Sequence, residues 1–206
     1  EEGIATQNLP EPTVTDPSEH FQAIAYEGTS ASTLTVDTNF QADWVWIKER
    51  TNSRSWHMYD SVRGEGKALY TNGAWVEDED EVNGYLDQFN ATNVRLTNGS
   101  TSGVNVKGSS SSNTYVMYCM KAGGTASSNS DGTITSNVSA NTTAGFSIVS
   151  YTGNSTADAT VGHGLSSTPE LIIVRNREGA ESWATWHKAL DSAKRLDLDN
   201  QNAQFS

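Results

Sequence analysis

The chain is poor in residues that would cross-link it, charge it positively or carry it through a membrane. Its single cysteine, Cys119, excludes an internal disulfide and a cysteine-based zinc site. Lysine and arginine number 13 against 25 aspartates and glutamates, which gives a net charge of −12. Nucleic acids and anionic membranes attract clustered cations, so we expect neither as a partner. No apolar run reaches the length of about 18 residues that a membrane-spanning helix needs, so we expect no membrane insertion.

What the chain does contain favours β-structure. Serine, threonine, asparagine and glycine are abundant, and there are six tryptophans and seven tyrosines. Residues 44–47, WVWI, are apolar at every position, which is typical of a central strand covered on both faces. Residues 114–120, TYVMYCM, indicate a second such strand and make Cys119 a core residue. Short strands separated by glycine, asparagine and serine turns predict an all-β fold, an antiparallel β-sandwich.

Composition divides the chain into four segments. Residues 1–20 hold three of the four prolines and predict an extended N-terminal arm. Residues 21–122 contain most of the predicted strands and form the first module. Residues 123–145 have few large apolar side chains and predict a polar connector with a weak hairpin. Residues 146–206 form a second module.

The second module repeats the first. FSIVSYTGNS begins at Phe146 and FQAIAYEGTS begins at Phe21, so Phe, Tyr, Gly and Ser recur 125 positions apart. Further on, Asp43 matches Glu170 and Trp56 matches Trp183 at a spacing of 127. Internal repetition of this length indicates a duplicated domain.

The second copy is incomplete, because the chain has only 23 residues after Trp183. It therefore has no counterpart of the strand that contains Cys119. We expect the sequence to be part of a longer protein; the alternative is a half unit that is completed by another chain.

Several segments together resemble a repeat module in virion structural proteins of tailed phages, especially marine ones. The resemblance extends over QADWVWIKER, YDSVRGEGKALYTN, NTYVMYCMKAGG, DGTITSNVSANTTAGFSIVSYTGN and ATVGHGL, and so covers nearly the whole chain. It implies a concanavalin-like sandwich of jelly-roll type, one complete module and part of a second, in a tail-fibre-like or other surface-exposed virion component. It implies no catalytic residue.

Aromatic residues near turns are candidate contacts for a glycan, because flat aromatic faces bind the apolar faces of sugar rings. The candidates are Trp56, Tyr59, Trp75 and Tyr85. The alternative is that they pack the sandwich or a subunit interface, since large aromatic side chains are mostly buried. The recurrence of Trp56 as Trp183 favours a structural role at that position.

The acidic run at residues 77–81 is the sharpest local feature. It has the oxygen ligands that Ca²⁺ prefers, but it does not have the spacing of a dedicated calcium loop, so we interpret it as a solvated acidic loop. We expect no metal, no cofactor and no catalytic residue.

These observations lead to three hypotheses about function. The first is a phage tail fibre or appendage, located on the virion, that attaches to host surface glycans. We expect it to form a homo-oligomer and to contact other virion proteins. The second is a capsid-surface or filament-forming protein with no receptor role. The third is a polysaccharide-degrading domain.

Overall fold

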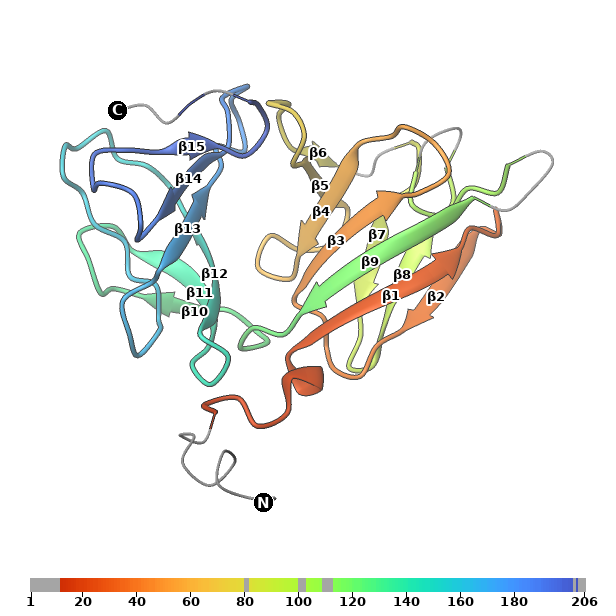
Figure 1. Cartoon of the computed structure of the whole chain (residues 1–206), viewed down its shortest axis with the longest axis horizontal. Helices are drawn as coiled ribbons and strands as arrows, with labels where there is room; N and C mark the ends of the chain where they lie inside the picture. The colour runs from red at the N-terminus through yellow and green to blue at the C-terminus, as the bar shows by residue number, and fades with distance from the viewer. Residues whose placement is uncertain (1–11, 80–81, 100–102, 109–112, 202, 204–206) are drawn as a thin grey trace, which may run out of the picture.

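Two groups of strands lie side by side (Figure 1). The structure is a computed structural model that describes residues 12–79, 82–99, 103–108, 113–201 and 203. One short 3-10 helix, η1 (Pro17–Glu19), precedes the first strand. We call β1 to β9 unit 1 and β10 to β15 unit 2. The arm predicted for residues 1–20 falls mostly outside the described residues, and its described end contains η1.

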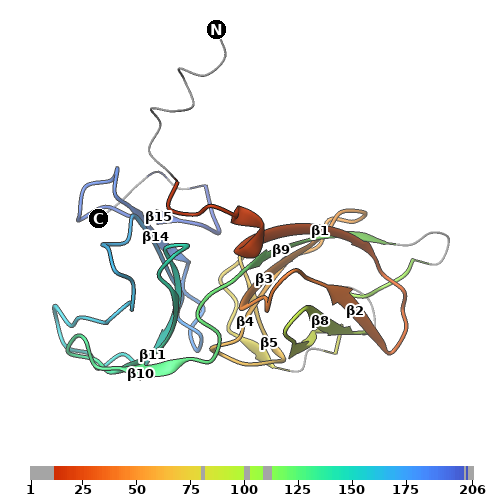
Figure 2. The ribbon, with the colours of Figure 1, turned by 90° about the horizontal axis from the view of Figure 1, so that it is seen from below.

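Unit 1 consists of two sheets. The larger has the order β1-β9-β3-β4-β5-β6 and the smaller the order β2-β8-β7. The strands are β1 (Phe21–Glu27), β2 (Thr33–Asp37), β3 (Trp44–Glu49), β4 (Trp56–Asp60), β5 (Lys67–Tyr70), β6 (Asp78–Glu79), β7 (Leu86–Phe89), β8 (Asn93–Thr97) and β9 (Thr114–Met120). Viewed from below, the two sheets face each other (Figure 2).

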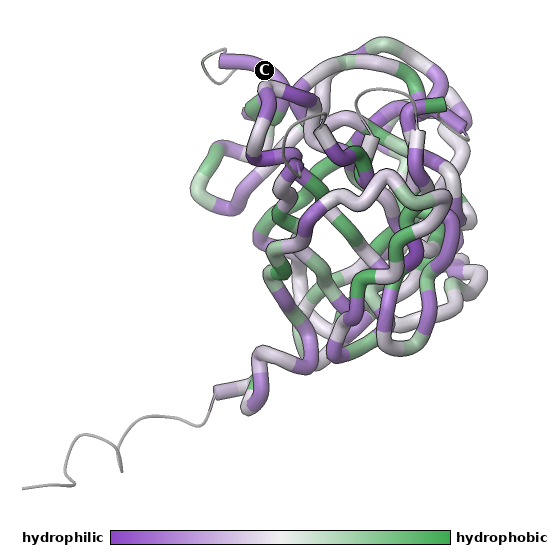
Figure 3. Tube along the Cα trace, turned by 90° about the vertical axis from the view of Figure 1, so that its right-hand side faces the viewer, coloured by the Kyte–Doolittle hydropathy of each residue, from purple (hydrophilic) through white to green (hydrophobic). Residues whose placement is uncertain are grey.

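The core of unit 1 lies between these sheets. Side chains alternate along each strand, so Val45 and Ile47 of β3 point inward together with Met117 and Cys119 of β9. From the smaller sheet, Leu86, Val94 and Leu96 meet them, and all of these side chains are buried. Burying a side chain of this size stabilises the fold by about 1.5–3 kcal/mol. Apolar segments concentrate in the middle of the molecule when hydropathy is mapped on the trace (Figure 3).

The prediction of an all-β fold with antiparallel sheets is confirmed. Every pairing between the named strands of the described residues is antiparallel. The two segments predicted to be central strands are central: β9 lies between β1 and β3, and β3 lies between β9 and β4. The jelly-roll, concanavalin-like arrangement stays a prediction.

Unit 2 consists of two three-stranded sheets, β10-β11-β12 and β13-β14-β15. The strands are β10 (Ser127–Asn129), β11 (Ser136–Asn141), β12 (Phe146–Tyr151), β13 (Leu171–Val174), β14 (Ala184–His187) and β15 (Leu196–Asp197). The segment predicted to be a polar connector with a weak hairpin, residues 123–145, contributes β10 and β11, which pair antiparallel as a hairpin. Their side chains are small, so they carry little hydrophobic signal, but β11 pairs along its whole length with β12.

The internal repeat is visible in the backbone. β12 corresponds to β1, β13 to β3 and β14 to β4. In unit 1, Ser61 N–H donates to the Asp43 carbonyl at the start of the β3–β4 pair. In unit 2, Lys188 N–H donates to the Glu170 carbonyl, and both residues are displaced by the same 127 positions. The duplication therefore preserves hydrogen-bond register as well as sequence.

Candidate ligand groove at the junction of the two units

The two units are joined by a tryptophan from unit 2. Trp183 is 4% exposed and packs with Met58 and Leu69 against the outer face of the larger sheet of unit 1. Its indole Nε1 donates to the Tyr70 carbonyl at 3.0 Å. The partly buried rings of Trp44 and Trp46 complete this cluster. The side of β3 that points away from the core of unit 1 is therefore partly covered by unit 2.

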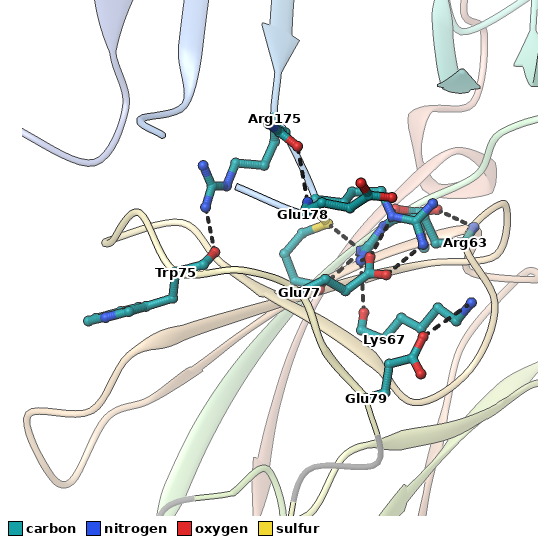
Figure 4. Close-up of polar contacts among 11 residues, drawn as sticks. Arg63, Lys67, Trp75, Glu77, Glu79, Arg175 and Glu178 are labelled. Atoms are coloured by element: carbon teal, nitrogen blue, oxygen red, sulfur yellow. Dashed lines mark hydrogen bonds and ion pairs between the residues drawn. The ribbon is translucent and has the colours of Figure 1, made fainter. Parts of the chain in front are cut away.

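An ion-pair network holds the same junction. Glu77 accepts from Arg63 Nη1 at 2.7 Å and from Arg177 Nη2 at 2.5 Å, and its backbone N–H donates to the Arg177 carbonyl. The side chains of Arg63 and Glu77 are 5% and 7% exposed. Figure 4 shows Glu77 with Arg63 beneath the segment that carries Arg175 and Glu178. Arg63 also contacts Asp60, so each buried charge has a partner.

The charge network determines the protonation of Glu77. Burial is the largest single influence and acts to raise its pKa, but the hydrogen bonds from Arg177 and Arg63 outweigh it. The net result is a pKa below the usual value for glutamate. Glu77 is therefore a structural anion.

This network corrects the interpretation of residues 77–81 as a solvated acidic loop at Glu77 and Asp78, whereas the Glu79 side chain is 69% exposed, as that interpretation expects. Glu77 is buried, Asp78 accepts from the Tyr70 hydroxyl at 2.8 Å, and Glu79 lies 3.7 Å from Lys67. Asp80 and Glu81 lie outside the described residues. The basic partner Arg177 is 100 positions away from Glu77, so no local pattern could have revealed the pairing.

Beside this junction an open cavity of about 640 Å³ forms what we call the Trp75 groove. Trp75 is 54% exposed, and its ring meets Tyr70 edge-on with centroids 5.7 Å apart. The apolar Val76 and, from unit 2, Ala180 also line the groove. The polar part of the lining consists of Ser53, Arg54, Ser55, His57, Asp78 and Asn83. A flat aromatic face beside hydroxyl, amide, guanidinium and carboxylate groups suits a polyhydroxylated ring.

Two titratable groups near the groove and the core are held neutral by burial. Burial lowers the pKa of His57 to about 4, and its ring meets Tyr70 at 5.1 Å. Burial raises the pKa of the Cys119 thiol to about 12, in agreement with the predicted core position. His57 thus presents a neutral imidazole at neutral pH.

The four predicted aromatic residues do not form one site. Trp75 lines the groove, and it is the one with a largely exposed ring. Trp56 packs against Trp46 with the two rings tilted by 40° and their centroids 4.5 Å apart, which agrees with a structural role. Tyr85 packs against the core cluster.

Tyr59 has to be corrected as a candidate glycan contact. Its side chain is fully buried in the core of unit 1, so a surface glycan cannot reach it. The physical reason is strand alternation: Trp56 and Met58 occupy the outer face of β4, and Tyr59 therefore points inward.

Of the residues that line the Trp75 groove, the sequence predicted only Trp75 as a ligand contact. Tyr70, Arg54 and Asp78 come from three separate segments, and Ala180 comes from the other unit. Trp75 follows an Asn-Gly turn, and this local pattern indicated an aromatic residue near the surface. Within the described residues no cluster of histidine, cysteine and carboxylate side chains could hold a metal ion. No helix in that part of the chain is long and apolar enough to cross a membrane.

The model of a family described as a domain of unknown function (DUF7483) matches residues 16–206. No curated protein and no solved structure matches the chain.

Proposed function

Because the chain belongs to the DUF7483 family, whose function is unknown, we propose a role from the Trp75 groove and from the resemblance to phage virion modules. The protein is a virion structural component, a tail fibre or appendage of a tailed phage. It displays its β units so that the Trp75 groove contacts glycans on the host surface. The observation that carries the proposal is the exposed Trp75 ring in a groove lined by polar side chains.

The lining suggests how a sugar would bind. The apolar face of a pyranose ring packs on the exposed indole of Trp75, while Ser53, Ser55 and Arg54 present hydrogen-bonding groups to its hydroxyls. The volume of about 640 Å³ lies within the range typical of small-ligand sites. The net charge of −12 disfavours polyanionic chains, so we expect a neutral glycan.

A single shallow site of this kind binds weakly, and a virion compensates by presenting many copies. When copies act together, avidity exceeds the affinity of one site by about 10²–10⁴. The expected homo-oligomer and the contacts with other virion proteins therefore belong to the same proposal.

The test is glycan binding by Trp75→Ala. Binding of the chain to an array of neutral bacterial glycans is followed by titration of the best ligand. Loss of the stacking ring is expected to weaken binding at least about tenfold, which corresponds to about 1.4 kcal/mol. Since Trp75 is largely exposed, the fold is expected to survive, as circular dichroism would verify.

Tyr151→Ala serves as the matched control, because Tyr151 is also an exposed aromatic residue, 44% accessible, but lies in unit 2 away from the groove. It is expected to bind as the wild type does. Equal binding by wild type and Trp75→Ala would rule out the groove as the glycan site.

The structure also bears on the two alternatives. A building block with no receptor role is favoured by the exposed apolar strand β13, in which Leu171 is 55% exposed. Deletion of residues 1–20 would separate the two roles. If the protein is a building block, assembly should fail, and if it is a receptor-binding appendage, glycan binding should survive. For a polysaccharide-degrading domain, Glu77 is unsuited as a proton donor, since two arginines hold its pKa low.

A further inference from the structure

The loop of unit 2 between β13 and β14 lies against the Trp75 groove of unit 1. We call this loop, residues 175–183, the strap. Its Ala180 is part of the groove lining. The Asn176 side-chain oxygen accepts from the N–H groups of Glu178 and Gly179 at 3.0 and 3.2 Å, which folds the strap into a turn. The strap is therefore a wall of the groove with a defined backbone geometry.

The strap bonds the backbone of both aromatic residues of the groove. Trp183 Nε1 donates to the Tyr70 carbonyl at 3.0 Å, and Arg175 Nη2 donates to the Trp75 carbonyl. Figure 4 shows the second bond, with the Trp75 ring pointing away from Arg175. The two strap residues also contact each other, because the Arg175 guanidinium lies 5.8 Å from the centroid of the Trp183 ring. One pair of contacting side chains thus holds the backbone that carries both rings of the groove.

The place of the Trp75 ring depends on this backbone. The ring meets Tyr70 edge-on. It also lies so close to Gly73 that a β-carbon at that position would overlap it. Because the ring is packed against two neighbours in its own segment, a shift of the backbone at residues 73–75 moves the ring as well.

Arg175 acts on Trp75 without lining the groove. The residues that line the groove do not include it. Its Nε and Nη1 atoms are buried and have no hydrogen-bond partner among the described residues. Substitution of Arg175 therefore removes the bond to the Trp75 carbonyl and leaves the hydrogen bonds of Arg177 and Trp183 across the junction in place.

We propose that Arg175 is a positioning residue for the glycan site, and that docking of the strap on unit 1 regulates this site. The Trp75 ring takes its binding position when the strap is docked. Glycan binding in turn stabilises docking, because coupling between two equilibria is reciprocal. The regulation of glycan binding rests on the proposed function, whereas the hold of the strap on Trp75 does not.

The first experiment needs no glycan. The whole chain is labelled with fluorotryptophan, and the fluorine NMR signal of Trp75 is identified by its absence in Trp75→Phe. The signal is expected to move in Arg175→Met, which removes the donor, and to stay near its wild-type position in Arg175→Lys, which keeps one. Gly73→Ala displaces the ring directly and shows how far the signal can move. Lys188→Met is the control matched in charge, because Lys188 is a cation of unit 2 with a 56% exposed side chain.

The second experiment measures the affinity for the neutral glycan that the wild type binds best on the array. Arg175→Met is expected to raise Kd at least about fivefold, because fewer chains hold the ring in its binding position. Arg175→Lys and Lys188→Met should stay within about twofold of the wild type. In a Trp75→Ala background Arg175→Met should have no further effect, since both changes act through the same ring. Saturating glycan should slow hydrogen exchange in the strap.

Two results would overturn the proposal. The first is a Trp75 signal that does not move in Arg175→Met. The second is an equal effect of Arg175→Met on affinity with and without the Trp75 ring, because Arg175 would then act through stability or charge alone. If Arg175→Met does not fold, Arg175→Gln takes its place, since its side chain is too short for the same bond.

The two experiments also separate this proposal from the proposed function. If no glycan binds the wild type, or if Trp75→Ala binds as the wild type does, the proposed function fails. The fluorine signal then still decides whether the strap positions Trp75. A signal that moves, together with glycan binding that depends on Trp75 and is unchanged in Arg175→Met, would refute the regulation and leave the glycan site standing.

Discussion

At the scale of single residues, His57 gives the clearest electrostatic consequence of the fold. Its imidazole is buried beside Tyr70, and burial lowers its pKa from 6.5 to about 4. Between these two values the unfolded chain binds a proton that the folded chain does not. Above about pH 6.5 the imidazole is neutral in both states, so His57 does not reduce the free energy of unfolding. As the pH falls from about 6.5 toward about 4, protonation of the unfolded chain lowers that free energy progressively.

We expect wild-type protein to lose up to about 3 kcal/mol of unfolding free energy from this group between pH 7.5 and pH 4. Urea denaturation at a series of pH values measures it. His57→Gln should remove this part of the pH dependence, while His187→Gln, at an exposed position, should keep it. If the free energy of unfolding depends on pH in the same way in wild type and His57→Gln, the buried imidazole does not have the lowered pKa described.

At the scale of elements, the loop before β6 and the loop after β13 hold each other through Glu77. Glu77→Gln leaves the buried Arg63 with a weaker partner and removes the charge that binds Arg177. We expect a loss of about 1.5–3 kcal/mol in unfolding free energy, because Arg63 keeps Asp60 but loses its charge-assisted hydrogen bond to Glu77, and Arg177 loses its bond to the same carboxylate.

Glu79→Gln is the matched control for this change. The side chain of Glu79 is 69% exposed and lies 3.7 Å from Lys67, so its loss should cost less than about 1 kcal/mol. Urea denaturation gives both values, and hydrogen exchange in residues 175–183 should accelerate in Glu77→Gln. Equal effects of the two substitutions would show that the loops are not joined through Glu77.

The elements differ in how far the sequence predicts them. Residues 44–47 and 114–120 have apolar side chains on both faces, and this pattern predicted β3 and β9 correctly. The segment at residues 136–141 consists mostly of small and polar side chains, and its pairing with β10 and β12 makes it a strand. Propensity is a weak guide where partners far along the chain decide the structure.

The groove was less predictable than the strands. Trp75 was predicted as a contact from residue type and proximity to a turn, whereas Tyr59 and Tyr85 have the same chemistry but point into or pack on the core. Periodicity could have excluded Tyr59, because it lies one position after Met58 on the alternate face. The contribution of Ala180 depends on the docking of unit 2, which no local pattern encodes.

At the scale of the whole molecule, duplication gives two units that play unequal roles. Unit 1 has a closed core between two sheets and carries Trp75, while unit 2 uses Trp183 to dock on its outer face. Within the described residues, β13 of unit 2 is an exposed apolar strand. One chain therefore combines a groove suited to a ligand with an exposed apolar strand.

The central claim is that the chain is a virion appendage that meets the host surface. The most direct measurement is immunogold electron microscopy of native phage particles with an antibody raised against residues 21–122. We predict label at the distal part of the tail. Label spread evenly over the shell or along a filament would contradict a receptor-binding role and make the protein a building block.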